Sequence, residues 1–341
     1  MKHRLIALIV LFGIAFSAVN ADHTRWQIDA ASINRLVIFG DDYSDMYNVY
    51  NASLQTFPNP IDFDGFAGPV CNGPLWWKHM LDSYINDYND LDYFTPQVMN
   101  FAYIFAGLNA TARPWASQTL TGDPIPDIGQ QVQIYIGTLA AFGAPPVSNT
   151  LHIIFAGINE LTHVNPPGST PPFAAYAAEL LSAGISILTS PLVGEGSQVL
   201  YVSLIPQGSS PYISARGSGA LLDSAINVFN GILRQTILAY KYMPNGYPEL
   251  EWVDVTAEWA RMAAKPAQYG MSLTGGPKNN PVGVCADYII GAPSAEHCED
   301  VNDFYWWNPI WTSAVTHRWL GKRVFLEAFK QGEEEFQTSY Y

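Results

Sequence analysis

Short apolar runs alternate with longer amphipathic stretches along most of the chain, and this alternation constrains the fold more than any other feature. The apolar runs lie at residues 36–38, 98–102, 151–155, 199–204 and 251–255. Helix-like stretches lie at residues 75–84, 129–142, 173–188, 221–240 and 312–329. Strands that alternate with helices predict an α/β fold, with a three-layer, doubly wound parallel sheet in one domain.

The first 21 residues have the layout of a secretory signal peptide. Lys2 and Arg4 precede an apolar run that ends at Phe16, and small residues lead to a cleavage position after Ala21. The run is short for a membrane-spanning helix, so we expect a secreted, extracellular protein without membrane insertion. The chain then divides into a signal peptide at 1–21, one domain at 22–331 and a C-terminal tail at 332–341.

The net charge excludes two classes of partner. The 341 residues carry a formal charge of −14, and loss of Lys2 and Arg4 with the signal peptide leaves 14 basic against 30 acidic residues, a charge of −16. Such a surface repels nucleic acid and anionic membranes, and no Lys/Arg cluster in the sequence offsets it. We therefore expect no nucleic-acid partner.

Cysteines and sequons add covalent expectations for a secreted chain. Cys285 and Cys298 bracket a short polar loop and predict a disulfide, while Cys71 is left over and expected to be buried. Asn51 and Asn109 each begin an N-glycosylation sequon. No Cys/His spacing typical of a metal site occurs, so we expect neither a metal nor another cofactor.

The turn Phe39-Gly40-Asp41-Asp42-Tyr43-Ser44-Asp45 directly follows the first apolar run. It resembles the F-G-D-S-x-[ST]-D block of the GDSL (SGNH) esterase and lipase family, in which the Ser is the nucleophile. Asp42 stands at that position here. The resemblance implies an SGNH-hydrolase, flavodoxin-like fold with an altered nucleophile turn.

Further blocks resemble the same family in the same order. Residues 71–76 resemble its S-N-G-P-x-W segment, and residues 100–103 resemble the start of N-[FY]-A-x-x-G-A. Phe105 takes the place of the oxyanion-hole Gly, with Gly107 two residues further on. Gly157-Ile158-Asn159-Glu160 resembles G-x-N-D, whose Asn completes the oxyanion hole. The resemblance thus implies that Asn159 is the polar catalytic residue that survives.

The last family block, W-D-x-x-H-P-T-x-x-x-H, supplies the Asp and His of the catalytic triad. Aligning Trp307 and His317 with it places Asn308 at the Asp position and Trp311 at the His position. Together with Gln131-Val132 and the Cys285/Cys298 loop, the pattern resembles the fungal-type acetylesterase branch, carbohydrate esterase family sixteen. All three triad members are replaced, so the family reaction by the family mechanism is not expected.

These replacements predict a catalytically silent protein that binds a ligand in the old cleft. The resemblance and the aromatic residues favour a polysaccharide or an acylated small molecule, held by Asp42, Asn159 and Trp311. The alternative is an active hydrolase that cleaves ester bonds by a non-standard mechanism. A protein without a small-molecule ligand also stays open, since Trp311 could fill the cleft as well as line it.

Acidic residues near the turn allow two further interpretations, both weaker. Asp42 and Glu160 could cleave a glycosidic bond if they faced each other at a suitable separation. The same carboxylates could hold calcium, although no spacing motif supports this. The structural interpretation is stronger, in which Asp41 and Asp45 stabilise the turn and Glu160 braces its loop.

Overall fold

The structure is a computed structural model of the 341-residue chain. It describes residues 28, 33–46, 48, 71, 73–88, 96–109, 124–143, 146–164, 171–271, 304–308 and 310–329. The predicted signal peptide, the 332–341 tail, Asn51, Cys285 and Cys298 lie outside these residues. Among the described helices, none combines the length and apolar character that a membrane-spanning helix needs.

Five parallel strands form the central sheet, in the order β2-β1-β3-β4-β5. The strands are β1 Arg35–Gly40, β2 Gln97–Asn100, β3 Thr150–Phe155, β4 Gln198–Val202 and β5 Leu250–Val253. This is the flavodoxin-like order of a doubly wound sheet. The predicted fold class is therefore confirmed. Each observed strand begins within two residues of the start of the predicted one.

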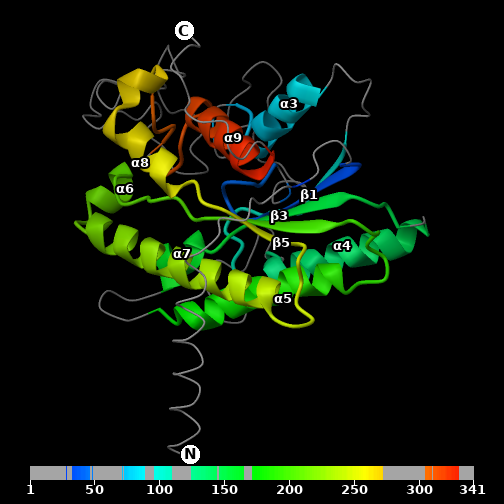
Figure 1. The fold of residues 1–341 in the computed structure, drawn as a ribbon. Coiled ribbons are helices and arrows are strands. Elements are labelled where there is room, and N and C mark those ends of the chain that lie inside the picture. Colours follow the sequence, from blue (N-terminus) through cyan, green and yellow to red (C-terminus); the bar gives the residue numbers. More distant parts are fainter. Residues whose placement is uncertain are drawn as a thin grey trace, which may run out of the picture.

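Helices cover both faces of the sheet, as Figure 1 shows, with α4, α5 and α7 on one side and α3, α8 and α9 on the other. The helices are α3 Trp76–Tyr88, α4 Ile128–Phe142, α5 Phe173–Leu188, α6 Pro211–Ser214, α7 Gly219–Tyr242, α8 Thr256–Ala264 and α9 Ala314–Phe329. A π-helix spans Glu160–Val164 and a 3-10 helix spans Pro266–Tyr269. The sequence prediction missed α6 and α8, because each is too short for its periodicity to stand out.

Local sequence explains where the best-defined helix begins and ends. Asp127 caps α4, accepting a hydrogen bond from the Gln130 backbone while the Gln130 side chain accepts one from the Asp127 backbone. Gly143 ends the helix with a left-handed backbone at φ 55°. These caps fix the position of Gln131, which reaches Gly40 at the turn after β1.

The centre of the sheet is apolar and contains few polar side chains. All six residues of β1 and all six of β3 are buried, as expected for strands covered on both faces. His152 of β3 is buried, and both of its ring nitrogens have hydrogen-bond partners. One ring nitrogen pairs with the Tyr135 hydroxyl at 3.0 Å and the other with the Gln198 carbonyl at 3.1 Å.

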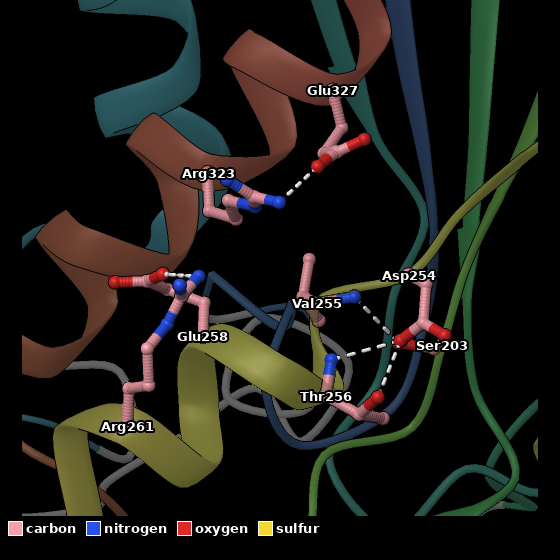
Figure 2. A network of polar contacts seen from close by, with 8 residues as sticks. All are labelled: Ser203, Asp254, Val255, Thr256, Glu258, Arg261, Arg323 and Glu327. Atoms are coloured by element: carbon pink, nitrogen blue, oxygen red, sulfur yellow. Dashed lines mark hydrogen bonds and ion pairs between the residues drawn. The ribbon is translucent and has the colours of Figure 1, made fainter. Parts of the chain in front are cut away.

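Polar contacts lie where the sheet meets the layer of α3, α8 and α9 (Figure 2). Asp254, just after β5, accepts hydrogen bonds from the Thr256 backbone and hydroxyl at the start of α8. Arg261 pairs with Glu258 on α8, and Arg323 pairs with Glu327 on α9. The Asp254 contacts join the start of α8 to the end of β5, whereas each of the two ion pairs lies within a single helix.

Candidate functional site: a buried carboxylate at the carboxyl ends of the strands

The turn that carries Asp42 leaves β1 in a tight and clamped conformation. Ser44 and Asp45 each donate a backbone N–H to the Asp41 carbonyl, at 3.0 and 3.1 Å. The Gln131 amide pairs with both backbone groups of Gly40, at 3.0 Å each. A Cβ at Gly40 would lie 2.4 Å from the Phe155 carbonyl, so only glycine allows β1 and β3 to run this close here.

The Asp42 carboxylate accepts hydrogen bonds from three N–H groups of three distant chain segments. Its Oδ1 accepts from the Phe105 backbone at 2.5 Å and from Asn159 Nδ2 at 3.2 Å. Its Oδ2 accepts from the Trp311 indole Nε1 at 3.2 Å. Asp42 is 5% exposed, Asn159 1% and Trp311 2%, so the whole group is buried. The structure thus brings together four of the six residues singled out from the sequence.

Phe105 holds its N–H in place through an unusual backbone. Its φ is +62°, in the left-handed region that bulky residues rarely adopt and that costs about 1–3 kcal/mol. The corresponding family position is a glycine in the resemblance above, so the conformation is one that glycine adopts freely. None of the described hydrogen bonds joins Gly107 to Asp42. The Gly107 carbonyl accepts from Ile128 and so joins the loop to α4.

Asn159 and Glu160 follow β3 and brace the same loop. Asn159 Nδ2 donates to the Ala106 carbonyl at 2.8 Å as well as to Asp42. Glu160 Oε1 accepts from the Leu108 backbone at 2.8 Å, which matches the bracing role expected from the sequence. Both Asp42 and Glu160 are buried, and Glu160 does not line the cavity beside Asp42, so the geometry gives the glycosidase interpretation no support.

Trp311 reaches the site from a short hairpin ahead of α9. Trp306 and Thr312 form an antiparallel bridge, and the backbone N–H groups of Trp307 and Asn308 both donate to the Trp311 carbonyl. Asn308 Oδ1 accepts from the backbone of Ile310 at 2.9 Å and of Trp311 at 2.8 Å. Asn308 is therefore a cap for its own hairpin and lies next to the site rather than in contact with Asp42.

His317 does not supply the missing imidazole base. It lies inside α9, and its Nδ1 accepts from the Trp76 backbone at 3.3 Å while its ring packs on Tyr43 at 5.7 Å between centroids. Burial lowers the pKa of His317 to about 3. Ser44 likewise stays structural, because its hydroxyl accepts from the Trp76 indole at 3.2 Å.

Two adjacent carboxyl groups lie buried here without a cation among their described partners. Asp41 Oδ2 accepts from the Gly157 backbone at 3.2 Å. Burial, followed by the charge of Asp42, raises the pKa of Asp41 to about 8. Burial also raises the pKa of Asp42, and the hydrogen bonds from Phe105, Asn159 and Trp311 oppose this. The pair therefore retains a proton near neutral pH, since both cannot be charged at low cost.

The space left beside Asp42 is small. A cavity of about 20 Å³ is lined by Asp42, Tyr43, Ile158, Asn159, Thr162, Gln207, Tyr212, Ile213, Ile310 and Trp311. This volume holds about one water molecule. Sequence reasoning did not find Gln207 or Tyr212, because both come from the segment after β4 and belong to no block of the resemblance. The Gln207 amide donates to the Tyr43 hydroxyl at 2.6 Å and closes this side of the site.

The remaining predicted sites have different outcomes. Cys71 is a free, buried cysteine, as expected. The Asn109 side chain donates to Glu179 at 3.3 Å, and its glycosylation stays a prediction. The Cys285–Cys298 disulfide and the Asn51 sequon lie outside the described residues. Within the described part of the chain, no group of three or more His, Cys, Asp or Glu residues is placed to hold a metal ion.

Comparisons with known proteins give low identities. No family model matches the chain. It is 22% identical over 343 residues to thermolabile hemolysin of Vibrio parahaemolyticus, across 96% of this chain and 72% of the hemolysin. An acetyl xylan esterase from Geobacillus stearothermophilus covers 87% of this chain and 95% of its own, with 12% identity and a TM-score of 0.45. A member of the lipolytic G-D-S-L family from Veillonella parvula covers 70% and 86%, with 10% identity and a TM-score of 0.36.

Proposed function

We propose that this chain is a secreted, catalytically silent protein with the fold of GDSL-type ester hydrolases, and that it acts by binding. One observation carries the proposal: Asp42 Oδ1 accepts hydrogen bonds from both Phe105 N–H and Asn159 Nδ2. In an ester hydrolase, donors at these positions stabilise the oxygen that becomes negative in the transition state. In this chain the Asp42 side chain already accepts the hydrogen bonds of both donors.

The replaced residues cannot perform the family reaction in the usual way. Acyl transfer needs a hydroxyl nucleophile, an imidazole that accepts its proton and a carboxylate that orients the imidazole. Trp311 instead donates its indole N–H to Asp42, and indole does not accept a proton near neutral pH. Asn308 caps its hairpin. Loss of a single triad member costs roughly a millionfold in turnover, so we expect none above background.

The proposed ligand is a glycan or an acylated small molecule, in keeping with the acetylesterase branch that the sequence resembles. Trp311 and Asn159 are buried, and a sugar ring is far larger than the cavity of about 20 Å³ beside them. Binding in the old cleft therefore requires the 306–312 hairpin to move outward. Secretion is supported by the signal-peptide layout of residues 1–21 and the two sequons.

An ester hydrolase with a non-standard mechanism is the second candidate. The observation in its favour is the water-sized cavity against the Asp42 carboxyl group. In that mechanism Asp42 would attack the ester carbonyl and release the alcohol, and water would then hydrolyse the resulting anhydride. Against it, both Asp42 oxygens accept hydrogen bonds, which lowers their nucleophilicity.

The test is hydrolysis of a panel of p-nitrophenyl acyl esters by the purified wild-type protein and by the triple variant Asp42→Ser, Asn308→Asp, Trp311→His. The proposal expects no wild-type turnover above buffer and a measurable gain in the triple variant. A matched control carries Asn308→Asp and Trp311→His but keeps Asp42, and should stay inactive. Wild-type turnover that disappears in Asp42→Ala would favour the second candidate.

A further inference from the structure

We infer that the Phe105 backbone N–H, the Asn159 amide and the Trp311 indole form a carboxylate-binding site, with Asp42 as its built-in ligand. When the Asp42 side chain is removed, the site would take a small monocarboxylate such as acetate. The inference deepens the proposed function, because it explains the closed cleft as a site that the chain itself occupies. It concerns binding alone and involves no reaction.

Each of the three donors is fixed before any ligand is considered. Phe105 holds its N–H in a left-handed backbone at φ +62°. Asn159 Nδ2 is anchored on the Ala106 carbonyl at 2.8 Å. Trp311 belongs to the hairpin that Asn308 caps. Donors that are held by separate structures lose little freedom when they bind a ligand, which favours binding.

All three donors are N–H groups and point to the two oxygens of one carboxylate. In the absence of Asp42, the Phe105 N–H and the Trp311 indole would be buried without this acceptor, which is costly, and Asn159 would keep only the Ala106 carbonyl. An anionic acceptor satisfies them better than a neutral one, since charge-assisted hydrogen bonds are the stronger class. A carboxylate also matches the arrangement, with two donors on one oxygen and one on the other.

Acetate has the size and shape of the group it would replace. The Asp42 side chain is a carboxymethyl group, so Asp42→Gly removes an acetate-like fragment from a closed site. The cavity of about 20 Å³ next to it, with Ile158, Ile213 and Ile310 in its wall, adds room for the methyl group. The space left by the side chain and the small cavity together fit only a short acid, so selectivity for acetate over a long acid such as hexanoate follows.

Asp41 sets the pH range in which an anion can enter. Its carboxyl group lies next to the site, and in the wild type burial, followed by the charge of Asp42, raises its pKa to about 8. In Asp42→Gly burial still raises this pKa, and a bound anion would take the place of the Asp42 charge. The other groups near the site are Tyr43, whose pKa is raised by burial, and Glu160, whose carboxylate is turned to the Leu108 backbone. Acetate binding should therefore weaken as the pH rises and Asp41 loses its proton.

The experiment measures the melting temperature of Asp42→Gly in sodium acetate against sodium chloride of equal ionic strength at pH 7. We expect acetate to raise it by roughly 2–4 °C once its concentration is several times the dissociation constant, with little effect of hexanoate. The wild type and Asp42→Asn should show no acetate-specific shift, because their site stays filled. The double variant Asp42→Gly, Asn159→Leu removes a donor and should lose most of the shift.

Two outcomes would overturn the inference: equal melting temperatures in acetate and chloride, or an equal acetate shift in the double variant. If Asp42→Gly does not fold, Asp42→Ala and the refolding yield in acetate give the same comparison. Failure here leaves the silent-enzyme proposal intact, because ester turnover is measured separately. Conversely, wild-type ester turnover would end that proposal without removing acetate binding by Asp42→Gly.

Discussion

Two groups of buried acidic residues in this molecule are stabilised in opposite ways. At the ends of the strands, Asp42 accepts hydrogen bonds from neutral N–H groups alone, and burial raises its pKa. On α8, Glu258 lies at the edge of the network in Figure 2 and pairs with the Arg261 guanidinium and the Tyr269 hydroxyl. The first arrangement joins three segments of the chain, and the second joins neighbours along it.

The difference shows which carboxylate the fold depends on. The Arg261 side chain is 58% exposed, so water screens its ion pair with Glu258 and can replace most of its contribution to stability. The donors to Asp42 are buried, and only Asn159 has a second acceptor among its described partners, the Ala106 carbonyl. A buried carboxyl group that accepts hydrogen bonds from fixed neutral donors is therefore the structural feature that distinguishes the turn after β1.

The largest expected effect is that of Trp311→Ala. It leaves a cavity where the indole was and removes one donor to Asp42, so the free energy of unfolding should fall by about 3–5 kcal/mol. Urea unfolding measures this. Trp311→Phe is the matched control, because it keeps most of the bulk and should cost about 1–2 kcal/mol. A loss below 1 kcal/mol for Trp311→Ala would mean that the hairpin does not close the site.

Asp42→Leu tests the acceptor instead of a donor. It leaves Phe105, Asn159 and Trp311 without their shared partner, and we expect a loss of about 2–4 kcal/mol in urea unfolding. Asp42→Asn keeps one acceptor oxygen and should cost less. The contrast with Glu258 would break down if Asp42→Leu were neutral, since an apolar replacement would then fit the site as well as the carboxylate does.

Asp41 predicts a pH dependence of stability. Its pKa is about 8 in the folded protein against an ordinary 3.8, so the folded state binds more protons between these values. The free energy of unfolding should fall as the pH rises from about 4 to about 8, by up to about 1.4 kcal/mol per pH unit, and level off above. Asp41→Asn should flatten this slope in urea titrations. An unchanged slope would show that Asp41 does not hold the proton.

Arg261→Ala should have the smallest effect. Its guanidinium is mostly exposed and Glu258 keeps the Tyr269 hydroxyl, so we expect a change below about 1 kcal/mol in urea unfolding. Salt at high concentration should reduce even this difference. A loss above 2 kcal/mol would make the α8 network as important as the Asp42 site and remove the contrast between them.

Much of the fold could be predicted because strand and helix patterns are local. The apolar runs at 36–38 and 151–155 predicted β1 and β3, and the resemblance of the blocks that follow them placed Asp42 and Asn159 in one cleft, where they form a hydrogen bond. The helix α8 escaped prediction because nine residues show little periodicity.

The chemistry of the site was less accessible from the sequence. The positive φ of Phe105 and the direction of the Trp311 indole depend on contacts between segments far apart in the chain. Trp311 was equally compatible with lining or filling the cleft, and only its 2% exposure and its hydrogen bond to Asp42 distinguish these. The hydrogen bond from Gln207 to the Tyr43 hydroxyl could be found only in the folded structure.

The most direct test of the account is the rate of p-nitrophenyl acetate hydrolysis by the wild-type protein, compared with Asp42→Ala and with buffer. The account predicts three equal rates from pH 5 to 9, because Asp42 is a bound acceptor and not a nucleophile. A wild-type rate well above buffer that Asp42→Ala reduces to background would contradict it, and would place an active carboxylate where we propose a silent one.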